Sequence, residues 1–289
     1  FQKKAHFRVL SYQETNLKVT YDRDLNMQDW FNDHEIEWEE FQSNGVLRGI
    51  SNREGWTKQW YGKMHSPQHA VELESINFLS ISQIEALGIE PYALTLKEHK
   101  RQRGGIEEAY RVLDSFINGR IEAYSRSISK PEESRSGCSR LSPYLAYGNL
   151  SIRQVYQKAY ALKKEGQHKR QLSAFLSRLR WHCHFIQKFE QEERMEFESV
   201  NRGYDNLDQP IRKDWIKAWE DGKTGYPLVD ACMRCLTQTG YINFRMRAML
   251  VSFFTHQLWQ PWQEATVHLS RHFLDFEPGI HFPQLQMQA

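Results

Sequence analysis

The sequence predicts a mostly α-helical protein, in which an all-helical domain follows a small α/β segment and a linker. From residue 106 onward, apolar residues recur at helical spacing in one segment after another. Residues 1–50 contain a single strand–helix–strand pattern, and residues 51–105 are polar with scattered prolines. We therefore expect an α/β remnant over 1–50, a linker over 51–105 and a helical domain over 106–289.

The α/β remnant is expected to contain a strand at 7–10, a helix at 26–32 and an alternating strand at 35–41. One such unit is less than a whole domain, so we interpret it as part of a Rossmann-like domain. The linker ends in a basic run at 97–103. In the helical domain, apolar periodicity predicts helices over 106–127, 151–164, 171–194, 210–221, 227–239 and 242–259.

Composition narrows the class of protein. The 289 residues suffice for one large domain or two ordinary ones, and the net charge of +2 does not by itself require a nucleic-acid partner. The cysteines (Cys138, Cys183, Cys232 and Cys235) are too few for a disulfide framework, which favours the cytoplasm. No apolar run approaches the roughly 20 residues that cross a bilayer, so we expect no membrane association.

Two short motifs around residue 230 suggest sites that their context does not support. Gly222, Lys223 and Thr224 resemble the end of a P-loop, but the glycine that opens such a loop falls on Lys217, inside a predicted helix. The Cys232-x-x-Cys235 pair lies on the apolar stripe of the helix 227–239, and no second pair or histidine cluster follows at zinc spacing. We interpret the thiols as core residues and expect no metal site.

The segment 136–145 offers a better place for a phosphate. Gly137 permits a tight backbone, and Ser142 followed by Pro143 is typical of a helix start, with the serine as its cap. Amides and hydroxyls at Ser139 and Ser142, with the charge of Arg140, would suit a pyrophosphate. An ordinary capped helix is the alternative interpretation.

Two arginines stand in a helix with apolar neighbours, at Arg245 and Arg247. A partly buried arginine needs a carboxylate, and Asp275 and Glu277 are the candidates. An aspartate held in this way stays ionised and can accept hydrogen bonds from the N–H groups of a ligand. A structural salt bridge is the alternative.

Together, these strings resemble the cryptochrome/DNA photolyase family. The matching strings are CSRLSPYLAYGNLS at 138–151, AWEDGKTGYPLVDACMRCLTQTGY at 218–241, Arg245-x-Arg247, and LDFE at 274–277. Their order and spacing are those of the flavin domain of the family. Residues 13–24 and 41–48 resemble the second half of the family's N-terminal α/β domain. The resemblance runs from about residue 15 to 289 and implies a fragment shortened at both ends.

The resemblance implies a U-shaped FAD inside the helical domain, and an antenna pigment is possible in the full-length protein. It assigns the diphosphate and ribityl groups to Tyr124, Cys138, Ser139, Arg140, Leu141 and Ser142. It places Asp275 at the edge of the flavin ring with Arg247 as its ion-pair partner. Glu277 takes a second acidic position at this edge.

On the substrate side, the chain departs from repair-competent members. Arg178 stands where they have an acidic contact, although the active-site tryptophan is kept as Trp181. The family's His-Asn-Arg falls on Asn243, Phe244 and Arg245. The resemblance gives DNA-binding roles to Arg178, Trp181, Asn243 and Arg245, and an arginine at 178 would favour contact with a phosphate.

The electron-transfer residues also differ. Leu285 stands where the family has the tryptophan nearest the flavin, while the next tryptophan of the family's electron-transfer chain is kept as Trp262. His281 replaces an asparagine that faces the flavin N5 atom in many photolyases, and we expect it to titrate near neutral pH. The resemblance thus gives catalytic roles to Trp181, Trp262 and His281.

Two functions follow from the resemblance. In a deoxyribodipyrimidine photo-lyase, reduced flavin excited by blue light donates an electron to a pyrimidine dimer flipped out of DNA. The alternative is a cryptochrome-like photoreceptor without repair activity. Trp181, Arg245 and the basic stretch 169–180 favour repair. The substitutions at Arg178, Phe244 and Leu285 favour the photoreceptor or a divergent repair class. We expect repair, with damaged DNA as the partner of a monomeric protein.

Overall fold

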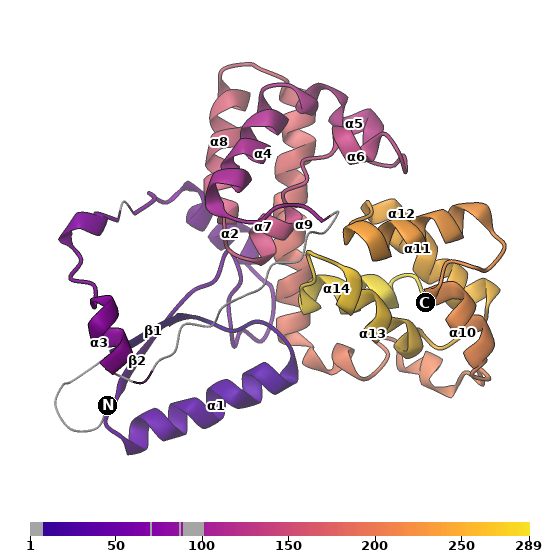
Figure 1. The fold of residues 1–289 in the computed structure, drawn as a ribbon, viewed down its shortest axis with the longest axis horizontal. Helices are drawn as coiled ribbons and strands as arrows, with labels where there is room; N and C mark the ends of the chain where they lie inside the picture. Colours follow the sequence, from indigo (N-terminus) through magenta and orange to yellow (C-terminus); the bar gives the residue numbers. More distant parts are fainter. Residues whose placement is uncertain (1–7, 70, 87, 89–100) are drawn as a thin grey trace.

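The computed structural model of the chain describes residues 8–69, 71–86, 88 and 101–289. It begins with a β–α–β unit (Figure 1), in which strands β1 (Arg8–Tyr12) and β2 (Glu37–Phe41) pair in parallel and helix α1 (Lys18–Asp33) connects them. Helix α1 is longer than predicted. Only Asp24 and Phe31 are buried on it, so its surface gives little apolar periodicity. The start of the predicted strand at Phe7 lies outside the described residues.

The predicted linker contains a helix that belongs to the core. Helix α2 (Trp56–His65) buries Trp56, Trp60 and Met64, whose spacing of four places them on one face. This face packs against helix α8 (Ile152–Lys164). The expectation of a surface linker is therefore wrong for this part. The 3-10 turn Leu73–Ser75 and helix α3 (Ile81–Ala86) bury no residue, and part of the basic run, 97–100, lies outside the described residues.

From residue 106 onward the described chain is helical, which confirms the predicted fold class. Besides α8, its helices are α4 (Ile106–Ile117), α5 (Tyr124–Ser127), α6 (Ser134–Gly137), α7 (Ser142–Ala146), α9 (Lys169–Gln191), α10 (Lys213–Glu220), α11 (Pro227–Thr239), α12 (Phe244–Ser252), α13 (Trp262–His272) and α14 (Pro278–Gln286). Short 3-10 turns cover Arg120–Ala123, Glu193–Glu196 and Arg202–Asn206, and a π-helical turn covers Phe253–Gln257. The predicted helix 106–127 breaks near Gly119. No described helix is long and apolar enough to span a membrane.

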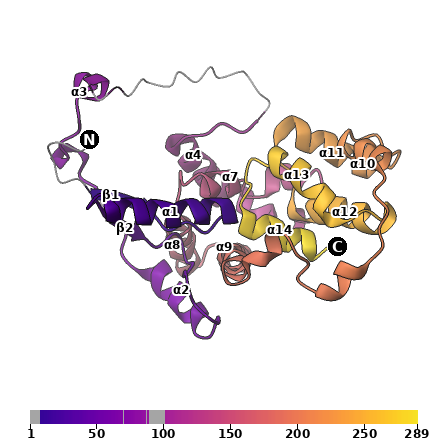
Figure 2. The ribbon, with the colours of Figure 1, turned by 90° about the horizontal axis from the view of Figure 1, so that it is seen from below.

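The long helix α9 joins two groups of helices (Figures 1 and 2). Its first part packs with α2, α4 and α8 around Trp60, Phe116 and Tyr144, and its end reaches a second core around Trp219 and Phe254 on the side of α10–α14. Helix α14 lies along α9. A Cβ atom at Gly279 of α14 would lie 2.6 Å from the Cα atom of Ile186 on α9, so only glycine allows this approach.

The Gly222–Gly225 turn binds a carboxylate from its own chain. The Asp230 carboxylate on α11 accepts hydrogen bonds from the Thr224 N–H at 2.8 Å, the Thr224 hydroxyl at 2.6 Å and the Gly225 N–H at 3.0 Å. Burial opposes the charged form, but these hydrogen bonds outweigh it and lower the pKa of Asp230. The amides that a P-loop would offer to a phosphate are thus occupied.

Asp230→Ala should therefore destabilise the protein by about 2 kcal/mol, because two backbone N–H groups and a hydroxyl lose a charged acceptor at a helix start. Urea unfolding followed by circular dichroism measures this effect. Asp221→Ala, which removes an exposed carboxylate paired with Lys217, should leave the midpoint nearly unchanged. Equal midpoints for the two variants would contradict the role of Asp230.

The two cysteines of α11 differ in environment. Cys232 is buried, and burial raises the pKa of its thiol to about 11. Cys235 is partly exposed, and its sulfur accepts a hydrogen bond from Arg135 at 2.7 Å. All four cysteines are free. Within the described chain, no group of three His, Cys, Asp or Glu side chains is placed to hold a metal ion.

Candidate functional site

A buried ion pair joins α12 to the loop before α14. The Arg247 Nη2 atom lies 2.7 Å from each carboxylate oxygen of Asp275, and the Nε–H donates to the Ile242 carbonyl at 3.2 Å. The guanidinium carbon lies 3.9 Å from the centroid of Phe273. The side chains are only 11% and 5% exposed. The structure therefore contains the pair that the sequence predicts, and Arg245 of the same helix is exposed.

Tyr241, which follows the Gly240 cap of α11, lies among several of the predicted cofactor residues. The Arg140 guanidinium carbon is 3.6 Å from its ring centroid. Burial raises the pKa of Tyr241, with a further increase from the nearby Cys138, while Arg140 and Arg247 oppose it. Burial also raises the pKa of Tyr124, to which Cys138 and Tyr241 again contribute. Residues from three separate segments thus meet around Tyr241, the last residue of the matching string 218–241, which was given no role of its own.

Arg120 fixes the loop between α6 and α7. Its guanidinium donates to the carbonyl oxygens of Ser136 at 3.4 Å and Ser139 at 3.2 Å, and also to that of Cys138. Further donors reach Val112 O and the Ser115 hydroxyl. Sequence reasoning missed Arg120, because an arginine after a glycine carries no motif.

The predicted serine cap is not formed. Helix α7 already includes Ser142, its N-cap position is Leu141, and no side chain caps this end. The Ser139 hydroxyl instead accepts from the Leu141 N–H at 3.4 Å. Because α7 has only five residues, the charge of Arg140 and the loop amides, rather than a helix end, are what this segment offers to an anion.

Glu277 pairs with a histidine on α9. The His182 Nε2 atom lies 2.6 Å from a Glu277 carboxylate oxygen. Burial, the largest single influence, works to lower the pKa of His182, but the charge and hydrogen bond of Glu277 together with the neighbouring Cys183 outweigh it and raise this pKa to about 10. The Nδ1 atom of His182 is buried without a partner among the described residues. No motif marks His182 in the sequence, because its role depends on contact with the distant Glu277.

His281 contradicts its prediction. Burial and the charge of Arg247 lower the pKa of this residue to about 4, although a hydrogen bond with the Thr266 carbonyl at 3.2 Å opposes the shift. His281 is therefore neutral at pH 7 and does not titrate near neutrality. Its neutral ring donates to the carbonyl oxygen through Nε2.

This shift predicts a pH dependence of stability. His281 has a depressed pKa in the folded state and an ordinary value of 6.5 when unfolded. Its contribution to the free energy of unfolding is therefore complete above pH 6.5. It is lost as the pH falls toward 4, and the loss amounts to about 3 kcal/mol. Burial also lowers the pKa of His268 to about 4, so both residues contribute to the slope. Urea unfolding between pH 7 and pH 4 should show a shallower slope for His281→Gln, and an unchanged slope would contradict this assignment.

The predicted DNA contacts lie in different environments. Arg178 and Trp181 are exposed on α9, and the Trp181 ring packs edge-on against His184. Asn243 is buried, and its amide donates to Lys130 O and the Ser134 hydroxyl while its oxygen accepts from the Met246 N–H at 2.8 Å. The structure thus uses Asn243 to cap α12, which leaves its side chain no exposed atom to offer to DNA.

Trp262 is buried in the second core, and its indole N–H has no partner among the described residues. Its ring lies 6.5 Å from that of Phe282, which lies 5.5 Å from His281. The Phe282 ring therefore lies between the two predicted residues Trp262 and His281.

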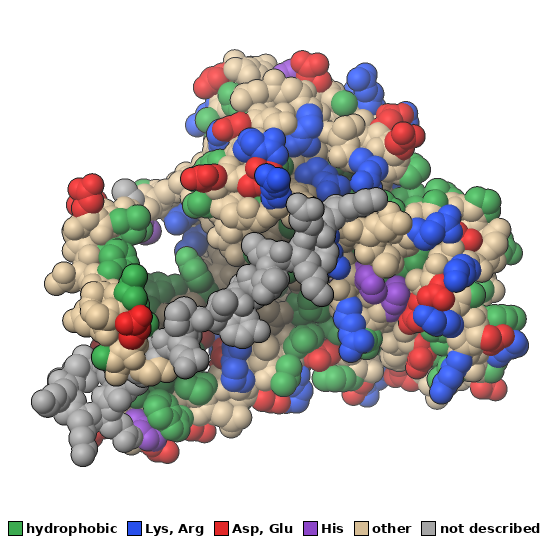
Figure 3. Space-filling model, in the orientation of Figure 1, with side chains coloured by type: hydrophobic (Ala, Val, Ile, Leu, Met, Phe, Trp, Pro, Cys, Tyr) green, Lys and Arg blue, Asp and Glu red, His purple; other side chains and the backbone are tan. Residues whose placement is uncertain are grey.

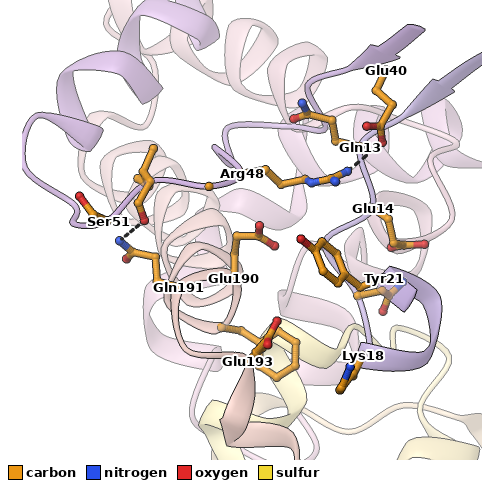
Figure 4. Close-up of a pocket in the computed structure, with 14 residues that line it drawn as sticks. Gln13, Glu14, Lys18, Tyr21, Glu40, Arg48, Ser51, Glu190, Gln191 and Glu193 are labelled. Carbon is orange, nitrogen blue, oxygen red and sulfur yellow. Dashed lines mark hydrogen bonds and ion pairs between the residues drawn. The ribbon is translucent and has the colours of Figure 1, made fainter. Parts of the chain in front are cut away.

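A separate cavity of about 560 Å³ lies between the β–α–β unit and the end of α9 (Figure 4). Glu190 points into it from α9, and burial raises the pKa of this carboxyl to about 7. The Arg48 side chain crosses the cavity, and its Nη1 atom lies 2.8 Å from the Oε1 atom of Glu40. None of the predicted site residues lines this cavity.

Comparison with known proteins identifies the family of the helical domain that contains the buried Arg–Asp pair. Residues 175–289 match the model described as the FAD binding domain of DNA photolyase. The chain is 30% identical over 185 residues to the deoxyribodipyrimidine photo-lyase of Alkalihalophilus pseudofirmus, covering 64% of this chain and 38% of the relative. It is 32% identical over 168 residues to Cryptochrome-1 of Arabidopsis thaliana, covering 53% of this chain and 23% of the relative.

A crystal structure of a bacterial class III photolyase from Agrobacterium tumefaciens has the same fold. It superimposes with a TM-score of 0.73 at 19% identity, over 98% of this chain and 61% of that chain. The chain therefore belongs to the cryptochrome/photolyase family, and it spans about two fifths of the length of the photo-lyase relative named above.

Proposed function

We propose that the helical domain binds FAD between the 138–142 loop and the Arg247–Asp275 pair. The donor set fits this cofactor. Asp275 is a buried carboxylate held by an arginine, which suits the N–H groups of a flavin ring. Arg140 supplies positive charge and the loop amides supply N–H donors for a diphosphate, and Tyr124 and Tyr241 supply buried aromatic walls. The Arg247–Asp275 pair is the single observation that carries this proposal.

When bound and reduced, the flavin would act as a one-electron donor driven by light. The residues of this chain would hold it and control its surroundings. Arg247 holds the Asp275 carboxylate in place at the ring edge, and neutral His281 offers a hydrogen-bonding ring without adding a charge. The His182–Glu277 pair joins α9 to the start of α14. It thereby fixes the segment that carries Asp275 and His281.

We infer that the full-length protein is a deoxyribodipyrimidine photo-lyase, acting on pyrimidine dimers in DNA. Exposed Trp181 would stack on an extruded base, and exposed Arg178 and Arg245 would contact phosphates. Several relatives named photo-lyase support this inference. A photoreceptor without repair is the second candidate. Leu285 supports it because a buried leucine replaces a redox-active ring.

One experiment separates the two candidates. The FAD-loaded, reduced protein is illuminated with blue light in the presence of DNA that contains cyclobutane dimers, and dimer loss is measured. Repair predicts dimer loss that depends on light and falls strongly in Trp181→Ala, whereas Trp215→Ala, which removes another exposed tryptophan, should leave the rate unchanged. No dimer loss, with flavin bound and photoreduced, would instead support the photoreceptor.

Two further expectations belong to this proposal. The free cysteines favour a reducing compartment, consistent with a cytoplasmic protein. The cavity of Figure 4 is our candidate place for an antenna pigment in the full-length protein, because its size suits a small organic ligand and its lining is distinct from the proposed flavin site.

A further inference from the structure

A second cavity, which we call the arginine pocket, lies beside the 136–140 loop and has a volume of about 430 Å³. Helix α4, the stretch 101–103 and the loop form its walls. Its six arginines are Arg101, Arg103, Arg111, Arg120, Arg135 and Arg140. Figure 3 shows Lys and Arg side chains gathered on this face, over α4 and beside α5 and α6. Tyr124, Tyr241, Arg247 and Asp275 do not line this pocket.

The charge of the arginine pocket is largely uncompensated. Among the described residues of its lining, Glu108 is the one acidic side chain, and it pairs with Arg111, whose Nε lies 2.7 Å from the carboxylate. Five arginines in the lining therefore have no carboxylate there to balance them. Such a concentration of guanidinium groups is costly unless an anion offsets it.

The two innermost arginines are Arg120 and Arg140, and their hydrogen-bond acceptors are neutral. Arg120 gives its N–H groups to neutral acceptors, so its hydrogen bonds are satisfied while its charge is not neutralised. Burial lowers the pKa of Arg120, and the neighbouring Arg140 lowers it further. Arg140 is also partly buried and bonds the neutral side-chain oxygen of Gln102 at 3.1 Å. The interior of the pocket thus holds two arginines whose hydrogen-bond acceptors are neutral.

The rim differs from the interior. Arg101, Arg103 and Arg135 are exposed, so their guanidinium groups can turn toward a ligand. Guanidinium groups match phosphate oxygens in paired hydrogen bonds. The volume is in the range of small-ligand sites, and a small anion can reach the inner arginines, whereas a nucleic-acid backbone would contact the rim.

We propose that the arginine pocket binds a small ligand with two or more phosphate groups, separately from the proposed flavin site. The inner arginines attract the anion, and those of the rim bind its oxygens directly. This proposal does not depend on flavin binding, because Arg140 is the only residue common to the two lining sets.

Calorimetric titration of the 289-residue chain with inorganic pyrophosphate at constant ionic strength tests the proposal. We expect saturable binding of one pyrophosphate per chain. Arg103→Gln and Arg135→Gln should each weaken it about tenfold, the loss expected for one charge-assisted hydrogen bond. Arg271→Gln, which removes an exposed arginine on α13, should bind as the parent does. Absence of saturable binding, or equal weakening in all three variants, would overturn the proposal.

Competition experiments distinguish the sources of the phosphate. Adenosine triphosphate should displace pyrophosphate, and the FAD-loaded chain should still bind pyrophosphate, because Arg140 alone is shared with the proposed flavin site. If bound FAD blocks pyrophosphate, the anion occupies the flavin diphosphate site and the separate pocket is refuted. If single-stranded DNA binds through Arg103 and Arg135 while pyrophosphate does not bind, a small-ligand site is refuted as well.

Discussion

Arg247→Ala is expected to remove FAD from the protein and to destabilise its fold. The substitution leaves the Asp275 carboxylate buried without its partner, and breaking a buried ion pair in this way costs about 3–5 kcal/mol. If Asp275 contacts the flavin ring, flavin affinity should fall as well. Flavin absorbance of the purified variant and its urea midpoint measure the two effects.

Two controls separate the loss of flavin from a loss of structure. Arg245→Ala removes an exposed arginine two positions earlier on the same helix, and it should retain both flavin and stability. The double variant Arg247→Leu with Asp275→Leu removes both charges, so it should recover much of the stability. It should nevertheless bind little FAD. An Arg247→Ala protein with full flavin absorbance would contradict the site.

Gly279→Ala is expected to have the second large effect. Its Cβ atom would lie 2.6 Å from the Ile186 Cα atom and 3.1 Å from the Ile186 Cβ atom. Because backbone cannot move aside as the end of a flexible side chain can, we expect α14 to shift and the protein to lose about 3 kcal/mol or more. Helix α14 carries His281 at its centre, so flavin binding should weaken too.

Gly62→Ala is the matched control. Gly62 is also in a helix, and a Cβ atom there would meet nothing within 4 Å. Alanine should therefore stabilise α2 by about 0.5–1 kcal/mol. Thermal unfolding of the two variants side by side measures the contrast. If Gly279→Ala proves as stable as Gly62→Ala, the close packing of α14 on α9 is wrong.

The fold could be predicted where buried faces repeat at helical spacing. Helix α11 has the predicted bounds, because Pro227 marks its start and Gly240, at φ 71°, marks its end. Helix α1 was only half predicted, since its surface position leaves few apolar residues to show a period. Helix α2 was assigned to the linker because its Trp56, Trp60 and Met64 pattern is short.

The site could be predicted where one residue in an apolar helix requires a partner of a specific chemical type. Arg247 in an apolar helix requires a carboxylate, and Asp275 was an evident candidate. Tyr241, Arg120 and His182 could not be found in this way. Their roles depend on contacts between segments distant in the sequence, and each is an ordinary residue in its local context. The low pKa of His281 likewise depends on burial by residues outside its own motif.

The central claim is that this chain holds FAD with its ring edge at Asp275 and its diphosphate at the 138–142 loop. Fluorescence titration of the flavin-free chain with FAD and with riboflavin, which lacks the diphosphate, tests it most directly. We expect one FAD to bind per chain. FAD should bind at least about tenfold tighter than riboflavin, because charge-assisted contacts to the diphosphate each contribute about 1.5–3 kcal/mol. No flavin binding, or equal affinity for the two ligands, would contradict it.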